Sequence, residues 1–240
     1  MPTMIFYDKP VALNRERHRD SKLLRQSGQF QFARDTNSVL MAGSEIHEAA
    51  RHYPVVFVSA PDNQYTLAAL LGLRDHENLF VDADGQWTSG AYVPAFVRRY
   101  PFVLAEGDND QLTVCVDESY PGWNQADGEC LFDDDGKDTP LLQGAVEFLK
   151  LFHGEMQRTR VFCARLAALD LLVPKTIRVE RDGKQEVLNG LHVVDEDKLR
   201  GLDDAQVLDL FRDGWLAWIH AHLGSLGNVE PLARLQTHLQ

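Results

Sequence analysis

The side chains most able to bind a ligand are concentrated in residues 87–102, where five aromatic residues and two adjacent arginines lie within sixteen positions. Tyrosine and tryptophan combine an apolar ring with a polar tip, and arginine adds a planar fork of donors, so the composition suits a binding surface or pocket wall. In the alternative interpretation, the rings pack a sheet and the arginines pair with nearby acids; spacing alone does not separate the two. The candidate binding residues are Trp87, Tyr92, Phe96, Arg98, Arg99 and Tyr100.

Motifs that would indicate a particular reaction are absent from the sequence. It contains no GxSxG nucleophile elbow, no GxxxxGK[ST] phosphate loop and no GxGxxG dinucleotide fingerprint, and its nine histidines form no HExxH pair. A carboxylate such as Asp82, Asp84 or Asp117 could still meet a histidine in a pocket, so an enzyme acting on a small molecule or peptide is the alternative to a binding protein.

Two acidic segments, residues 82–85 and 133–136, begin like a calcium-binding loop. Such a loop requires a bidentate glutamate at its twelfth position, where this sequence has Val93 and Gly144. We therefore expect ordinary turns in both places, with a weak cation site in the second as the alternative. The sequence predicts no metal site and no cofactor.

Cysteine usage and hydropathy indicate a cytoplasmic protein. Cys115, Cys130 and Cys163 are an odd number without CxxC spacing, which suits a reducing compartment and small core residues. Residues 1–9 lack the basic start and apolar stretch of a secretory signal. No apolar run approaches the roughly 20 residues that span a bilayer, so we expect no transmembrane segment.

The charge distribution argues against a nucleic-acid partner. The chain carries 24 Lys and Arg against 36 Asp and Glu, a net charge of -12, whereas phosphate binding needs clustered basic residues. Residues 108–138 hold ten acids and one base, Lys137, while residues 1–60 hold eight bases and six acids. A solvated acidic loop is the simplest interpretation, and orientation of a partner or cation is the alternative.

The first half of the chain is predicted to be mostly sheet. Short extended segments are expected at 30–33, 39–42, 55–58 and, with helix as the alternative, 66–73; hairpins are expected at 79–87 and 102–116. Short helices are expected at 45–51, with Ser44 as N-cap, and at 93–100.

The second half is predicted to be mainly helical. Thr139-Pro140 begins one long helix, or two broken near Gly154. A hairpin follows over 177–194, and helices run from Asp203 with breaks at Gly214, Gly224 and Gly227. No linker interrupts the chain, so we expect one α+β domain over residues 1–240, with an antiparallel or mixed sheet core, β-hairpins and a helical C-terminal portion.

Several strings of the sequence resemble the SapC family of bacterial proteins. They are residues 52–57 (HYPVVF), 69–73 (ALLGL), 78–82 (NLFVD), 85–87 (GQW), 92–102 (YVPAFVRRYPF), 131–133 (LFD) and 188–199 (LNGLHVVDEDKL). The resemblance spans nearly the whole chain. It implies an association with bacterial surface-layer (S-layer) systems, in the company of outer-membrane receptors and flavin-dependent halogenase-like proteins, and it carries over no catalytic residue.

Three hypotheses follow. The leading one is a non-enzymatic accessory or binding protein of a surface-layer or outer-membrane uptake pathway, with residues 87–102 contacting a protein partner or a small-molecule or peptide ligand. The second is the enzyme described above. The third is a lattice-forming surface protein that assembles through residues 108–138, and a homo-oligomer is compatible with all three.

Overall fold

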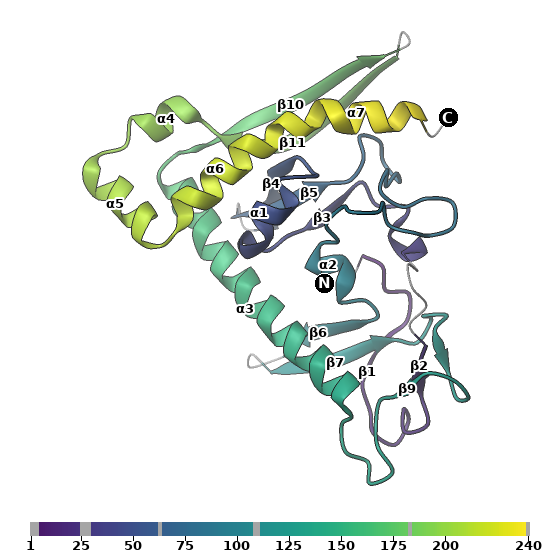
Figure 1. The fold of residues 1–240 in the computed structure, drawn as a ribbon. Helices are drawn as coiled ribbons and strands as arrows, with labels where there is room; N and C mark the ends of the chain where they lie inside the picture. The colour runs from purple at the N-terminus through teal and green to yellow at the C-terminus, as the bar shows by residue number, and fades with distance from the viewer. Residues whose placement is uncertain (1–4, 25–29, 62–63, 108–110, 182–183, 239–240) are drawn as a thin grey trace.

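The computed structural model of the protein describes residues 5–24, 30–61, 64–107, 111–181 and 184–238 (Figure 1). The acids at 108 and 110 and residues 182–183 of the predicted hairpin lie outside these stretches. Among the helices of the described chain, none combines the length and apolar character that a membrane crossing requires.

The largest sheet has five antiparallel strands in the order β10-β11-β4-β5-β3. Its strands are β3 (Ser38–Leu40), β4 (Val55–Ala60), β5 (Gln64–Leu70), β10 (Leu172–Arg181) and β11 (Lys184–Val194). Three successive residues of β4, from Val55 to Phe57, are fully buried, so both faces of this strand are covered. The strands predicted at 39–42, 55–58 and 66–73 and the hairpin at 177–194 are confirmed, and so is the α+β class.

Two smaller antiparallel sheets lie beyond the large one. The first, in the order β1-β7-β6, contains β1 (Pro10–Ala12), β6 (Phe102–Glu106) and β7 (Leu112–Asp117), which confirms the predicted pairing over 102–116. The second, in the order β8-β2-β9, contains β2 (Lys22–Leu23), β8 (Trp123–Asn124) and β9 (Glu129–Cys130). Both sheets bring the N-terminal segment against residues 112–130.

One continuous helix, α3 (Pro140–Ala168), links the small sheets to the large one (Figure 1). Thr139 caps it by accepting a hydrogen bond from the Leu142 N–H, as the Thr-Pro sequence predicts. Leu142 and Leu149 belong to the cluster under the small sheets, while Phe152, Phe162, Cys163 and Leu166 belong to the main core. The helix does not break at Gly154, because its apolar positions continue on one face beyond that residue.

The C-terminal portion is helical, as predicted. It contains α4 (Glu196–Arg200), α5 (Asp204–Arg212), α6 (Trp215–Ser225), the 3-10 turn η5 (Leu226–Asn228) and α7 (Val229–His238). A break does occur at Gly214, which has a φ of 74° and precedes α6. Gly224 lies within α6, so the break predicted there is wrong, whereas Gly227 lies in η5, which separates α6 from α7 as predicted.

Two local predictions in the first half are wrong. Residues Gln31–Ala33 form a 3-10 turn, η1, instead of a strand, because tertiary contacts of Phe30 and Phe32 decide their conformation. Ser44 does not cap a helix; it lies inside the 3-10 turn η2 (Gly43–Glu45), which leads into the short α1 (Ile46–Ala49). The side chain that closes this turn is Glu45, which accepts the Ala42 N–H at 3.0 Å.

The other expected turns are confirmed. An isolated bridge between Val81 and Trp87 closes the turn at 82–85, and one between Phe132 and Asp138 closes the turn at 133–136. Asp82 and Asp133 accept backbone N–H groups within their own turns. The described residues contain no group of three His, Cys, Asp or Glu side chains placed to share a metal ion.

Candidate functional site

Trp87 belongs to the core. It is 8% exposed, and its indole N–H donates to the Tyr53 hydroxyl at 3.1 Å, which in turn donates to the Tyr92 carbonyl. Its ring also contacts Phe30 and Phe80. Trp87 therefore joins the 82–87 turn to the main core, as the packing interpretation predicts.

Tyr92 and Arg98 meet at the buried carboxylate of Glu45. This carboxylate accepts the Tyr92 hydroxyl at 2.8 Å and the Ala95 N–H at 2.6 Å, and lies 4.0 Å from the Arg98 guanidinium. Arg98 also donates to the Tyr92 hydroxyl at 3.1 Å. Burial, with Glu45 adding to it, raises the pKa of Tyr92 to about 12, so the phenol stays protonated. These contacts hold the short helix α2 (Ala95–Arg98) against η2.

Arg99 has a different environment, because its guanidinium is surrounded by aromatic rings. Its Cζ lies 3.9 Å from the centre of the Phe96 ring, 5.5 Å from that of Phe152 and 5.8 Å from that of Tyr7. Among the described residues no carboxylate lies within ion-pair distance of it, and its buried Nε has no acceptor. Burial lowers the pKa of Arg99, although the group stays charged.

Tyr100 joins the aromatic segment to β7. Its ring stacks on Phe32 with the ring centres 4.0 Å apart, and its hydroxyl donates to the Asp117 carboxylate at 3.2 Å. Burial first, and the charge of Asp117 second, raise the pKa of the Tyr100 phenol. Tyr120 packs edge-on against Tyr100, with 5.4 Å between ring centres.

A cavity of about 700 Å³, here called the arginine cavity, lies beside these residues between α2, β2 and the first turns of α3. Arg98, Arg99 and Tyr100 contribute to its wall, whereas Trp87, Tyr92 and Phe96 are not among the described lining residues and pack behind it. Its only acidic lining residue in the described chain is Glu129. Its remaining wall is mainly apolar, including Phe30, Phe32, Tyr120, Leu141 and Phe148.

A second cavity of about 630 Å³, here called the aspartate cavity, adjoins the first. The two share Phe32, Tyr100 and Tyr120, so these three rings form a ridge between them. The charged residues that line the aspartate cavity in the described chain are all acidic: Asp8, Asp35 and Asp84. Sequence reasoning considered only Asp84 of these, since Asp8 and Asp35 carry no motif.

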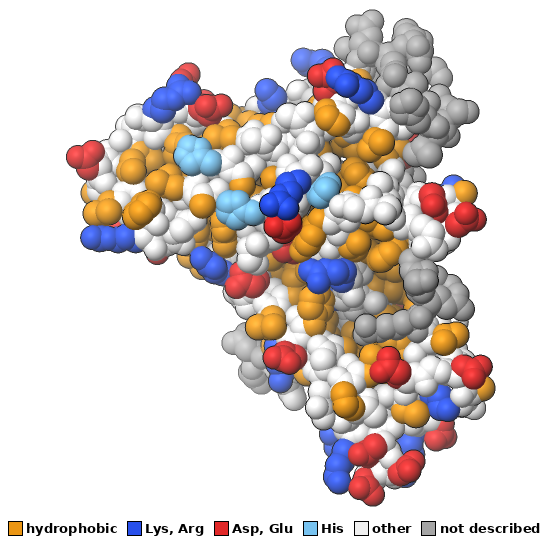
Figure 2. Space-filling model, in the orientation of Figure 1, with side chains coloured by type: hydrophobic (Ala, Val, Ile, Leu, Met, Phe, Trp, Pro, Cys, Tyr) orange, Lys and Arg blue, Asp and Glu red, His pale blue; other side chains and the backbone are white. Residues whose placement is uncertain are grey.

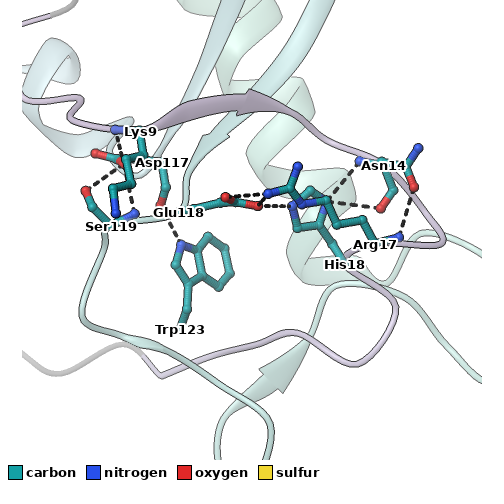
Figure 3. Close-up of polar contacts among 8 residues, drawn as sticks. All are labelled: Lys9, Asn14, Arg17, His18, Asp117, Glu118, Ser119 and Trp123. Carbon is teal, nitrogen blue, oxygen red and sulfur yellow. Dashed lines mark hydrogen bonds and ion pairs between the residues drawn. The ribbon is translucent and has the colours of Figure 1, made fainter.

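Asp117 is fully buried and serves the fold (Figure 3). Its carboxylate accepts the backbone N–H groups of Asp8, Lys9 and Ser119 at 3.0 Å each, together with the hydroxyls of Ser119 and Tyr100. Burial disfavours the charged form, but these hydrogen bonds outweigh it and lower the pKa of Asp117. Because the carboxylate is saturated with donors, Asp117 does not supply the catalytic carboxylate of the enzyme hypothesis.

The acidic segment is partly neutralised by the basic N-terminal segment. Arg17 pairs with Glu118 at 2.6 Å, and the buried His18 lies 3.4 Å from the same carboxylate (Figure 3). Arg15 pairs with Asp138 at 3.1 Å. The basic N-terminal segment and the acidic segment that the sequence distinguishes therefore lie against each other within one chain.

Cys163 and His222 are buried in the main core, and both are held in their uncharged forms. Burial raises the pKa of the Cys163 thiol to about 12, and burial lowers the pKa of His222 to about 4. His222 accepts the Val194 N–H through Nε2 at 3.1 Å and lies 2.8 Å from the Val55 carbonyl through Nδ1. It is a neutral histidine that ties α6 to two strands.

A different surface lies on the arm formed by α4 and α5, where Figure 2 shows hydrophobic side chains gathered among charged ones. Val207, Leu208 and Phe211 share one face of α5, and Phe211 is 68% exposed. Exposed apolar groups of this kind are typical of protein contacts.

The protein therefore has an α+β fold with two adjoining cavities. The arginine cavity lies on one side of an aromatic ridge and the aspartate cavity on the other. The SapC family model matches residues 13–232, and the chain belongs to the SapC family. No curated protein and no solved structure matches the chain.

Proposed function

We propose that this SapC-family protein is a non-enzymatic binding protein of a bacterial surface-layer or outer-membrane uptake pathway, and that the arginine cavity is its ligand site. The proposal includes a location in the cytoplasm and a ligand that is a small molecule, a peptide or an exposed segment of a protein partner. Family membership supports the pathway, and the contents of the cavity wall support binding.

The observation that carries the proposal is the environment of Arg99. A charge removed from water is costly unless a counter-charge or hydrogen bonds replace the lost hydration. The Tyr7 hydroxyl accepts a hydrogen bond from the guanidinium, and the rings of Phe96, Phe152 and Tyr7 add cation–π attraction, but none of these supplies a counter-charge. An anionic group bound in the cavity would supply the missing counter-charge, and arginine favours carboxylates because its donor fork matches their two oxygens.

The cavity also suits a ligand with an apolar body. Its volume of about 700 Å³ is within the range of small-molecule sites, and aromatic residues from four separate segments line it. Phe148 additionally lies under the Arg98 guanidinium, with 5.2 Å from Cζ to the ring centre. An anion attached to an aromatic or aliphatic group therefore fits this wall better than a small inorganic ion.

The test measures binding of 3-phenylpropionate to the full chain by calorimetry, with 3-phenylpropanamide as the uncharged control ligand. We expect saturable binding of the carboxylate that is lost in Arg99→Met, which removes the charge but keeps an apolar side chain. Arg51→Met is the matched control, because Arg51 is exposed and pairs only with Glu48 among the described residues.

Absence of millimolar binding by the unmodified protein would contradict the proposal. Equal binding by Arg99→Met and the unmodified protein would contradict it as well. Circular dichroism of each variant establishes that the comparison is made between folded proteins.

A further inference from the structure

The arginine cavity and the aspartate cavity differ in the sign of their charge. Two arginines and one glutamate line the first, whereas three aspartates and no described basic residue line the second. Phe32, Tyr100 and Tyr120 belong to both. A ligand that occupied both cavities would cross this ridge with its two ends in opposite electrostatic environments.

The carboxylates of the aspartate cavity are available to a ligand. Asp8, Asp35 and Asp84 are exposed, and none of their carboxylates forms an ion pair or a hydrogen bond with another described residue. This distinguishes them from Asp117 and Asp82, whose oxygens accept backbone N–H groups. Three carboxylates without an ion-pair partner in the described chain attract a cation, and an ammonium group is a cation that short organic ligands can carry.

The ridge between the cavities suits an apolar middle portion. Tyr100 and Phe32 stack face to face, and Tyr120 meets Tyr100 edge-on, so ring surfaces separate the charged regions. The hydroxyl of Tyr100 is directed away to Asp117, which leaves its ring as the contact surface. Aromatic and aliphatic side chains gain free energy by covering such rings.

From this arrangement we infer that the ligand of the proposed site is a short zwitterionic peptide, with its carboxylate at Arg98 and Arg99, its ammonium group at Asp8, Asp35 and Asp84, and an apolar side chain across the ridge. This inference rests on the proposed function, because it specifies the ligand class of the same site. The separation of the two charged ends of a peptide is set by its length, since an extended chain gains about 3.3–3.6 Å per residue.

The experiment uses the tripeptide Ala-Phe-Ala in four forms: both ends free, N-acetylated, C-amidated, and blocked at both ends. Binding to the full chain is measured by calorimetry at low salt. We expect the free peptide to bind most tightly and each blocked end to weaken binding by about tenfold, the effect of losing one favourable charged contact.

Variants assign each end of the peptide to its cavity. In the double variant Asp35→Asn with Asp84→Asn, N-acetylation should no longer matter while C-amidation still does. In Arg99→Met the opposite result is expected: N-acetylation should still weaken peptide binding, whereas C-amidation should have no effect. Asp135→Asn is the matched acidic control, because Asp135 is exposed on the 133–136 turn and outside both cavities.

The outcomes separate this inference from the proposed function. If 3-phenylpropionate binds but the four peptides bind equally well or not at all, the zwitterionic ligand is refuted while the binding site stands. If neither 3-phenylpropionate nor any peptide binds, both are refuted. Because chemical blocking of the peptide needs no variant, the test holds even if Arg99→Met fails to fold.

Discussion

Removal of the Asp117 carboxylate should destabilise the protein more than loss of any exposed acid. The Asp117→Ala change deprives five donors of their acceptor, of which three are backbone N–H groups that cannot turn elsewhere. These three join the N-terminal segment and residue 119 to the end of β7, where β1 also pairs. The loss therefore acts on the attachment of residues 8–12 to the small sheet.

The magnitude follows from the number of donors. A hydrogen bond to a charged group contributes about 1.5–3 kcal/mol, and a buried donor left without a partner costs about 1–3 kcal/mol. Asp8 and Lys9 are exposed, so water replaces part of what their N–H groups lose. Counting the three backbone donors at roughly 1–1.5 kcal/mol each gives a loss of about 3–4.5 kcal/mol.

The assay is urea denaturation at neutral pH, with the change in free energy of unfolding taken from variants whose m-values agree. Asp135→Ala is the control, because its carboxylate is 74% exposed and pairs with the equally exposed Lys137; its effect should stay below about 0.5 kcal/mol. A loss below about 1 kcal/mol for Asp117→Ala would refute the view that Asp117 holds the N-terminal segment in place.

The pH dependence provides a second readout of the same group. Because the folded pKa of Asp117 is lowered, its ionised form contributes stability above the ordinary aspartate pKa of about 3.9, and that contribution is lost as the pH falls through the folded value. The difference in unfolding free energy between the unmodified protein and Asp117→Asn should be constant near neutrality and shrink in this acidic range. A difference that stays constant throughout would contradict the lowered pKa.

Three further predictions concern other positions in the protein. Because the unfolded protein protonates His222 at its ordinary pKa of about 6.5 but the folded one only near 4, His222 alone should lower the unfolding free energy by about 3 kcal/mol between pH 7 and pH 4. This part of the pH dependence should be absent from His222→Gln. Gly43→Ala would place a Cβ 2.1 Å from an indole carbon of Trp218 and should lower the free energy of unfolding by at least about 2 kcal/mol. Gly154 lies in an exposed and open part of α3, so Gly154→Ala should raise the free energy of unfolding by about 0.5–1 kcal/mol. Thermal unfolding of both variants measures this contrast. Tyr53→Phe leaves the Trp87 indole N–H without its acceptor and should cost about 1–3 kcal/mol in urea denaturation; an unchanged midpoint would contradict that role.

The regular elements could be predicted because their signals are local. The apolar run of β4, the paired segments of β6 and β7 and the Thr-Pro start of α3 each depend on residues close in sequence. The turn at 31–33 could not, since the alternation of Phe30 and Phe32 imitates a strand while their rings contact Trp87 and Tyr100 from distant segments. Local pattern and tertiary contact disagree there, and the tertiary contact decides.

The candidate site shows the same division. The composition of residues 87–102 identified the arginine–aromatic segment. Only the three-dimensional contacts show that Arg98 pairs with Glu45, whereas Arg99 has no acidic partner among the described residues. The aspartate cavity has no sequence signal, because Asp8, Asp35 and Asp84 come from three loops. The proposed pathway and oligomeric state remain predictions, and so does the role of Trp87, Tyr92 and Phe96 in binding, since these three support the cavity from behind.

The long helix α3 has a mechanical consequence. Its 29 residues extend over roughly 44 Å at 1.5 Å per residue, and its first half is fixed in one hydrophobic cluster while its second half is fixed in the other. If the side chains of one cluster separate, one end of α3 loses its packing contacts while the other end stays packed in the other cluster. We therefore expect amide hydrogens near the middle of α3 to exchange only when both hydrophobic clusters unfold together, so that this helix couples the unfolding of one cluster to that of the other.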